Sequence, residues 1–170
     1  MEPTKMFIQS AERIGRRLNP PSMLRVDRRC LTVVRRSLMA VWPQEGCALL
    51  LGTGHSNVSL QLETVWPACN RWGADGVELP WLSTLDGDRC SNFALDPLEQ
   101  LAAQRWARAR NQVCFGVAHS HPRSDARPST ADRLRAASDQ LMLILAADGD
   151  LKAWWLGEDR QVRPVLIDVQ

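Results

Sequence analysis

The spacing of hydrophobic residues changes several times along the chain, and each change predicts an element. A short strand at 24–26 precedes a helix capped by Asp27 and closed by Pro43. The apolar positions of this helix follow helical spacing: Cys30, Leu31, Val34, Leu38 and Val41. The continuous apolar run at 46–52 predicts a buried strand, and the segment 58–68 predicts a second strand.

A second helix is predicted at residues 96–110, where the signals for a helix start are strong. Asp96 stands at the N-cap position, Pro97 at the first helical position and Glu99 at the third, while Asn111 would end the helix. We expect the side that faces the core to carry the apolar stripe Leu98, Leu101, Ala102 and Ala109.

The segment 113–121 has the alternation of a strand. It would direct one set of side chains to one face, namely Val113, Phe115, Val117, His119 and His121. A short helix from about Thr130 and strands at 140–147, 151–157 and 162–168 follow, with a turn at 148–149. The adjacent Trp154 and Trp155 should face opposite sides of their strand.

Two segments lack this regularity. Residues 1–22 end in Pro20 and Pro21 and are interpreted as an N-terminal appendage, while 71–92 is rich in Gly and Asp and predicts an insertion or long loop. The remaining pattern predicts one domain over 23–170. Its expected class is α/β, with a mixed β-sheet flanked by helices and antiparallel at its C-terminal end.

Composition narrows the class further. The chain has 170 residues, of which 45% are hydrophobic and 24% charged, with a net charge of +2, which favours a soluble globular protein and provides no argument for nucleic-acid binding. Apolar runs are too short to cross a bilayer and the N-terminus lacks a secretory signal, so a cytoplasmic location is expected. The five cysteines are scattered singly, which argues against disulfides and a Cys-rich zinc site.

Candidate chemistry centres on two of the three histidines, since His55 is interpreted as a turn residue. His119 and His121, two residues apart on a strand, would point the same way and could bind one ion, although two polar residues in a turn is the alternative. Asp132, eleven residues after His121, would add a carboxylate from a helix start. Two imidazoles and one carboxylate leave a position open for water, as in catalytic zinc sites.

Two further residues would complete a hydrolytic site. Glu45, just before the buried strand at 46–52, is the candidate general base, and Ser129 is the candidate donor to an oxyanion. Each has a plainer interpretation. Ser129 and Asp132 have the spacing of a helix capping box, and Glu45 alone would more often be a solvated loop residue.

The complete set of residues resembles a known family. Glu45, "HSH" at 119–121, Ser129 and Asp132 reproduce the E, H-[S/T]-H, seven-residue gap, S-x-x-D pattern of the JAMM, or MPN-plus, metallopeptidases of prokaryotic type. "WPQEGCALLLG" looks like the P-x-E-x-C-G-L-L-x-G segment of that family, with Ala48 where Gly is usual, and "SNFALDPLEQ" is similar to the segment before its second helix.

The resemblance implies a cytidine-deaminase-like fold and one Zn²⁺ ion, bound by His119, His121, Asp132 and a water molecule. Glu45 would activate that water and Ser129 would stabilise the tetrahedral intermediate. Family members cut peptide or isopeptide bonds, commonly at the C-terminal Gly-Gly of a small β-grasp (ubiquitin-like or sulfur-carrier) protein, which would be the partner here.

Three other classes of protein can be compared with this sequence. A non-catalytic MPN-type scaffold or protein-binding module is the alternative, although such members typically lack the ligands that this chain keeps. A zinc deaminase would need H-x-E with P-C-x-x-C, and a cupin a further downstream His; the sequence contains neither.

Overall fold

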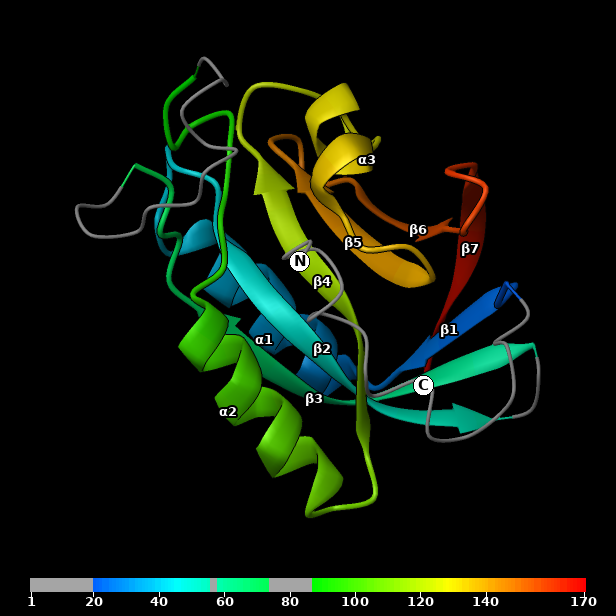
Figure 1. The fold of residues 1–170 in the computed structure, drawn as a ribbon. Coiled ribbons are helices and arrows are strands. Elements are labelled where there is room, and N and C mark those ends of the chain that lie inside the picture. The colour runs from blue at the N-terminus through cyan, green and yellow to red at the C-terminus, as the bar shows by residue number, and fades with distance from the viewer. Residues whose placement is uncertain (1–19, 56–57, 74–86) are drawn as a thin grey trace.

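The computed structural model describes residues 20–55, 58–73 and 87–170 (Figure 1). Within these ranges seven strands and three helices follow one another in the order β1 (Met23–Val26), α1 (Arg28–Met39), β2 (Cys47–His55), β3 (Ser59–Ala68), α2 (Pro97–Arg108), β4 (Val113–His121), α3 (Thr130–Arg135), β5 (Gln140–Ala146), β6 (Leu151–Leu156) and β7 (Val162–Val169). Every predicted element is therefore present, with bounds that differ by a few residues. The strand expected at 140–147 ends one residue earlier, at Ala146.

All seven strands belong to one mixed sheet that closes on itself, in the order β1-β3-β2-β4-β5-β6-β7. β1 closes it by pairing in parallel with both β3 and β7. The end predicted to be antiparallel, β5-β6-β7, is antiparallel. The mixed α/β class is confirmed, but the expected flanked sheet is only part of the description, because the strands form a closed barrel.

The barrel interior is filled by one apolar cluster that includes α1. Cys30, Val34 and Leu38 of α1 pack there with inward side chains of every strand, including Trp155 of β6. Asp27 caps α1 as predicted, accepting a hydrogen bond from Cys30 N at 2.6 Å. Val41 lies beyond the end of α1 and is exposed, so its predicted place on the buried stripe is wrong.

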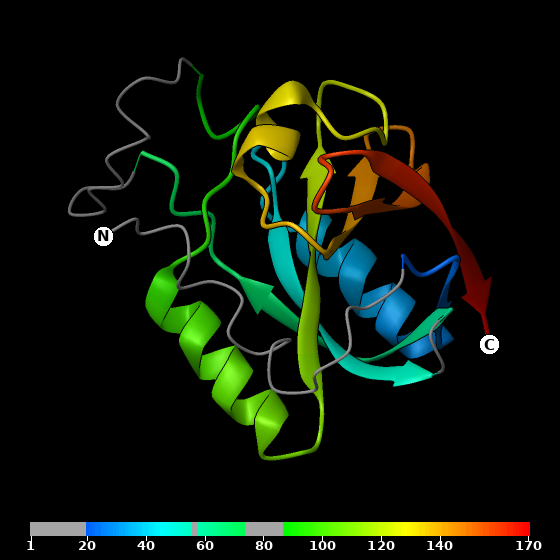
Figure 2. The ribbon, with the colours of Figure 1, turned by 45° about the vertical axis from the view of Figure 1, so that its right-hand side comes forward.

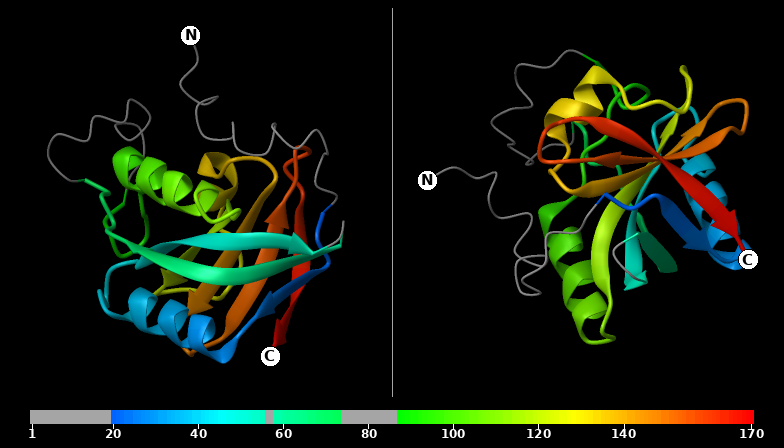
Figure 3. Two further views of the ribbon diagram at one scale, coloured as in Figure 1. Left: turned by 90° about the horizontal axis from the view of Figure 1, so that it is seen from below. Right: turned by 90° about the vertical axis from the view of Figure 1, so that its right-hand side faces the viewer.

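The second helix, α2, packs on the outer face, on the opposite side of the β2–β3 pair from α1 (Figure 3). Its start agrees with the sequence, since the Asp96 side chain accepts from Leu98 N. The predicted apolar stripe is wrong: Leu98 is 76% and Leu101 39% exposed, and the buried residues are Ala103 and Ala107. Small side chains let the helix approach the strands closely, so the larger leucines of its first turns turn outward.

The predicted alternation of side chains along β4 is wrong before Val117, because the strand contains a bulge. Leu50 pairs with Gly116 and Leu51 with Cys114, so Phe115 is the extra residue. Phe115 consequently joins the interior cluster while Val117 packs on the outer face. Val113 also packs against the interior cluster, so neither Val113 nor Phe115 shares the face of Val117.

Several expectations fall partly or wholly outside the described ranges. These are residues 1–19 of the expected N-terminal appendage and residues 74–86 of the expected insertion. Both ends of the insertion, 71–73 and 87–92, are described and lie near the site considered next. No helix in the described ranges is long and apolar enough to cross a membrane.

Candidate metal centre

The candidate residues meet at one end of the sheet because β2 and β4 are antiparallel. Cys47, at the start of β2, pairs with His119, near the end of β4. Continuing this register by two residues places Glu45 opposite His121. Since β4 and β5 are parallel neighbours, the chain returns between them through α3, which lies over the end of β4 (Figure 2).

His119, His121 and Asp132 come together as the spacing predicted. The two Nε2 atoms are 3.0 Å apart. Asp132 Oδ1 lies 3.4 Å from His119 Nε2, and Asp132 Oδ2 lies 3.2 Å from His121 Nε2. Both imidazoles are buried, with 0% and 3% of their surfaces exposed.

These distances fit a tetrahedral zinc ion. With ligands about 2.0–2.2 Å from the metal, two ligand atoms of a tetrahedron are about 3.3 Å apart. The two Nε2 atoms are separated by 3.0 Å, and each lies within 3.4 Å of one of the two Asp132 oxygens, so each contact is close to that value. A donor set of two imidazoles and one carboxylate also suits Zn²⁺ and leaves a fourth position open.

The orientation of each imidazole has a separate cause. His121 Nδ1 lies 2.8 Å from the Asp125 carbonyl, which can only accept, so Nδ1 carries the proton and Nε2 keeps its lone pair in the neutral ring. Trp154 Nε1 supports the same loop by donating to Ala126 O at 2.7 Å. The His119 ring instead stacks on Phe93, with centroids 4.5 Å apart, and its buried Nδ1 has no hydrogen-bond partner among the described residues.

Asp132 fits both interpretations of its position in the sequence, as a capping residue of α3 and as a candidate metal ligand. Asp132 Oδ2 accepts from Ser129 N at 2.7 Å, and Ser129 Oγ accepts from Asp132 N at 3.0 Å, which completes the capping box of α3. The same carboxylate faces both imidazoles. Burial raises the pKa of Asp132, but the charge interaction with His119 and the contacts with His119, His121 and Ser129 hold it well below its usual range.

Glu45 is buried, with only 5% of its surface exposed, and is therefore not the solvated loop residue of the plainer interpretation. Burial raises the pKa of its carboxyl to about 8. His121 lowers this pKa and Asp132 raises it, so both side chains act electrostatically on Glu45. The structure thus places a carboxyl with a shifted pKa at the same end of the sheet as the three candidate ligands.

Ser120, between the two histidines, has a structural function that the sequence did not indicate. Its Oγ accepts from Gly46 N at 2.8 Å and donates to Leu38 O, at the end of α1, at 3.3 Å. Gly46 itself allows this contact, because a Cβ there would lie 2.4 Å from the Leu38 carbonyl oxygen. The hydroxyl therefore fixes the residue next to Glu45 against α1.

Ser120→Ala is expected to destabilise the fold by about 1–3 kcal/mol, because the buried Gly46 N–H would lose its acceptor. Urea denaturation followed by circular dichroism measures this loss. Ser124→Ala, in the exposed loop after β4, is the matched control and should change stability little. Equal stability of the two variants would contradict the function assigned to Ser120.

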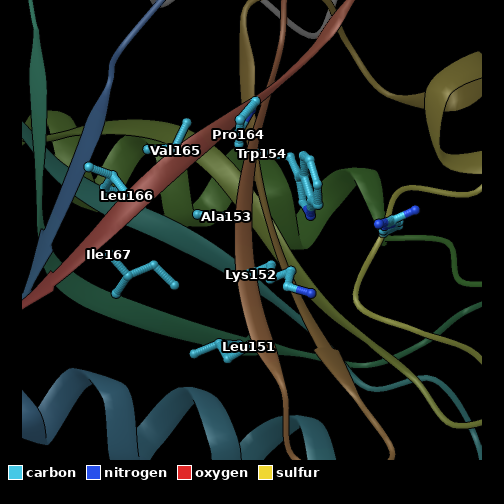
Figure 4. A pocket seen from close by; sticks show the side chains of 9 residues that line it. Leu151, Lys152, Ala153, Trp154, Pro164, Val165, Leu166 and Ile167 are labelled. Atoms are coloured by element: carbon cyan, nitrogen blue, oxygen red, sulfur yellow. The ribbon is translucent and has the colours of Figure 1, made fainter.

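A separate hollow lies where β6 and β7 diverge (Figure 4). It encloses about 380 Å³ and is mostly apolar, with Leu151, Ala153, Trp154 and Ile167 in its wall. Its only charged lining side chains are Arg127 and Lys152, and no His, Cys, Asp or Glu contributes to it. The residues that line this hollow therefore offer no metal ligand, in contrast to those of the candidate metal centre.

Comparisons with known proteins give the family and the fold of this chain. The family model described as prokaryotic homologs of the JAB domain matches residues 27–157. A solved structure from Desulfitobacterium hafniense is 25% identical with a TM-score of 0.69, over 87% of this chain and 93% of its own. Another, from Salinibacter ruber, is 26% identical with a TM-score of 0.60, over 86% and 91% of the two chains. Comparison with curated proteins produced no significant match.

Proposed function

We propose that this chain, which belongs to the family of prokaryotic homologs of the JAB domain, is a zinc-dependent hydrolase of peptide or isopeptide bonds. The observation that supports this proposal is the cluster of His119, His121 and Asp132, in which one ligand atom from each residue lies within 4.8 Å of the others. The buried carboxyl of Glu45 at the same end of the sheet supports hydrolysis as the reaction.

In the proposed mechanism, zinc would supply Lewis-acid polarisation and a water of lowered pKa. Glu45 accepts a proton from the attacking water while the oxygen of that water bonds to the scissile carbonyl carbon. Glu45 then returns that proton to the leaving nitrogen as the carbon–nitrogen bond breaks. Burial holds the pKa of this carboxyl above its usual range, which suits a group that must take and return a proton.

Ser129 is assigned to the oxygen that becomes negative during this attack. Its Oγ accepts a hydrogen bond from Asp132 N, and the hydroxyl proton remains available for donation. Because the capping box fixes Ser129 beside Asp132, the hydroxyl is oriented before substrate binds. Capping and catalysis are thus compatible functions of one residue.

The proposed substrate is a small β-grasp protein, ubiquitin-like or a sulfur carrier, cut after its C-terminal Gly-Gly. This proposal comes from the resemblance of Glu45, His119, His121, Ser129 and Asp132 to the JAMM motif, whose family commonly cuts next to the C-terminus of such proteins. The 71–92 segment is the candidate source of specificity, since its described ends lie around Glu45.

The direct test is metal-dependent hydrolysis by the full-length protein. We expect one zinc ion per chain and release of a C-terminal extension from a β-grasp carrier protein, measured by mass spectrometry. EDTA should abolish this release and added zinc should restore it. Zinc binding without hydrolysis of any carrier tested would favour the non-catalytic scaffold, and absence of zinc binding would refute the metal site.

A further inference from the structure

Asn70 lies at the point where the β2–β3 ladder ends. Cys47 pairs with Ala68 in that ladder, so continuing the register by two residues places Glu45 opposite Asn70. There a side-chain hydrogen bond stands in the place of a backbone one, because Asn70 Nδ2 donates to Glu45 O at 3.0 Å. The general-base candidate is thus attached to the neighbouring strand by a side chain.

The Asn70 amide uses every hydrogen-bonding position that it has. Nδ2 donates to Glu45 O and, at 2.9 Å, to Asn92 O, while Oδ1 accepts from Trp72 N at 3.0 Å and Ala94 N at 3.2 Å. Reversing the amide would set its oxygen against two carbonyls and its NH₂ against two N–H groups, so its orientation is fixed. One side chain therefore joins three separate stretches of backbone.

The other backbone group of Glu45 is held from the same region. Glu45 N donates to Arg89 O at 2.7 Å. Asn70 immediately precedes the 71–92 segment, and Arg89 lies near its C-terminal end. Both hydrogen-bonding groups of the Glu45 backbone are therefore held by residues at the start and near the end of this segment.

A further contact extends the network to the helix that carries Asp132. Arg135, three residues later on α3, donates to Asn92 Oδ1 at 2.8 Å, and its guanidinium carbon lies 4.3 Å from the centre of the Trp72 ring. Asn92 is buried and in turn bonds Asn70 through its carbonyl. The backbone of Glu45 is thus connected to α3 through Asn70, Asn92 and Arg135.

We propose that Asn70 is a positioning residue that holds Glu45 at its working distance from the metal ligands, an inference that rests on the proposed hydrolase function. Glu45 precedes β2, so sheet pairing alone does not fix its backbone. A general base must reach the proton that it takes within hydrogen-bond distance, and a displacement of about 1 Å can cost roughly 100-fold in rate. The amide of Asn70 supplies the missing restraint.

Asn70→Ala and Asn70→Asp test this function together. Alanine removes all four hydrogen bonds, whereas aspartate keeps the two from Trp72 N and Ala94 N and loses both donations. Because aspartate keeps the two hydrogen bonds accepted from Trp72 N and Ala94 N, it also serves if the alanine variant fails to fold, and its second oxygen then faces the Glu45 and Asn92 carbonyls. Gln112→Ala is the matched control. Gln112 lies just before the start of β4, roughly 20 Å along the strand from His119, and its amide donates to Glu63.

Three measurements should be made on the zinc-loaded, full-length variants: steady-state kinetics, zinc affinity and hydrogen exchange. We expect kcat on the β-grasp carrier substrate to fall about 10- to 100-fold in both Asn70 variants, with KM and zinc affinity within about threefold of the parent. Hydrogen exchange of the Glu45 amide should accelerate about two- to tenfold. Gln112→Ala should leave all three unchanged.

The outcomes separate the two proposals. If the parent protein cleaves no carrier, the hydrolase function fails, whatever the Asn70 variants do. If the parent is active and folded Asn70→Asp keeps parental kcat and parental exchange at Glu45, the positioning function is overturned. Equal losses in kcat and in zinc affinity would also overturn it, because they would mean general damage to the site.

Discussion

Glu45→Gln is expected to lower kcat by about two to four orders of magnitude while zinc stays bound. The amide has nearly the same size as the carboxyl but cannot accept the proton of the attacking water. His119, His121 and Asp132 keep their positions, so zinc content should equal that of the parent. Hydrolysis of a β-grasp carrier and zinc content, measured on the same preparation, check this prediction.

Stability provides the control for Glu45→Gln. Burial raises the pKa of Glu45 from 4.5 to about 8 in the metal-free protein, so the folded state resists ionisation of this carboxyl. Its contribution to stability therefore falls as the pH rises from about 4.5 towards 8, and the uncharged amide avoids that loss. At pH 8 the metal-free variant should unfold at no lower temperature than the parent. Parental turnover by a folded Glu45→Gln would remove Glu45 from the mechanism.

An inactive form that retains zinc would also trap the substrate. Glu45→Gln immobilised with its metal should retain β-grasp proteins ending in Gly-Gly from a cell extract, because binding precedes the lost chemical step. Purified carrier added back should then bind the variant and be cut by the parent. A carrier that binds but remains uncut would contradict the proposed substrate.

Losing a residue that hydrogen-bonds to a metal ligand typically costs roughly 10- to 100-fold in metal affinity. His121→Ala is expected to weaken zinc binding by more than this, because it removes a ligand itself. Asp132→Asn should also weaken binding strongly. Its amide oxygen can still accept from Ser129 N, so the α3 cap is kept while the ligand charge is lost. Competition with a zinc-binding dye measures both affinities.

Asp125→Ala is the matched control for these ligand variants. Asp125 lies on the adjacent loop, but it supports His121 through its main-chain carbonyl, which alanine retains. Its exposed carboxylate should therefore be dispensable for zinc. If Asp125→Ala weakened binding as much as Asp132→Asn, bulk negative charge and not ligation would explain the effect.

Local signals predicted most of the elements well. Asp27 and Asp96 cap α1 and α2 as expected, because a cap depends on side-chain and backbone groups only two or three residues apart. The outward turn of Leu98 in α2 was not predictable, since the buried face of a helix depends on what packs against it. The bulge at Phe115 likewise appears only when β4 pairs with β2.

The sequence by itself determined the candidate donor set: the spacing of His119, His121, Ser129 and Asp132 specifies two imidazoles, a hydroxyl and a carboxylate within one strand–loop–helix unit. Only the tertiary structure decided how Glu45 is held. Gly46 meets Ser120 from 74 residues away, and Glu45 meets Asn70 from 25 residues away. Such contacts depend on the register between strands, which the hydrophobic period of a single strand does not encode.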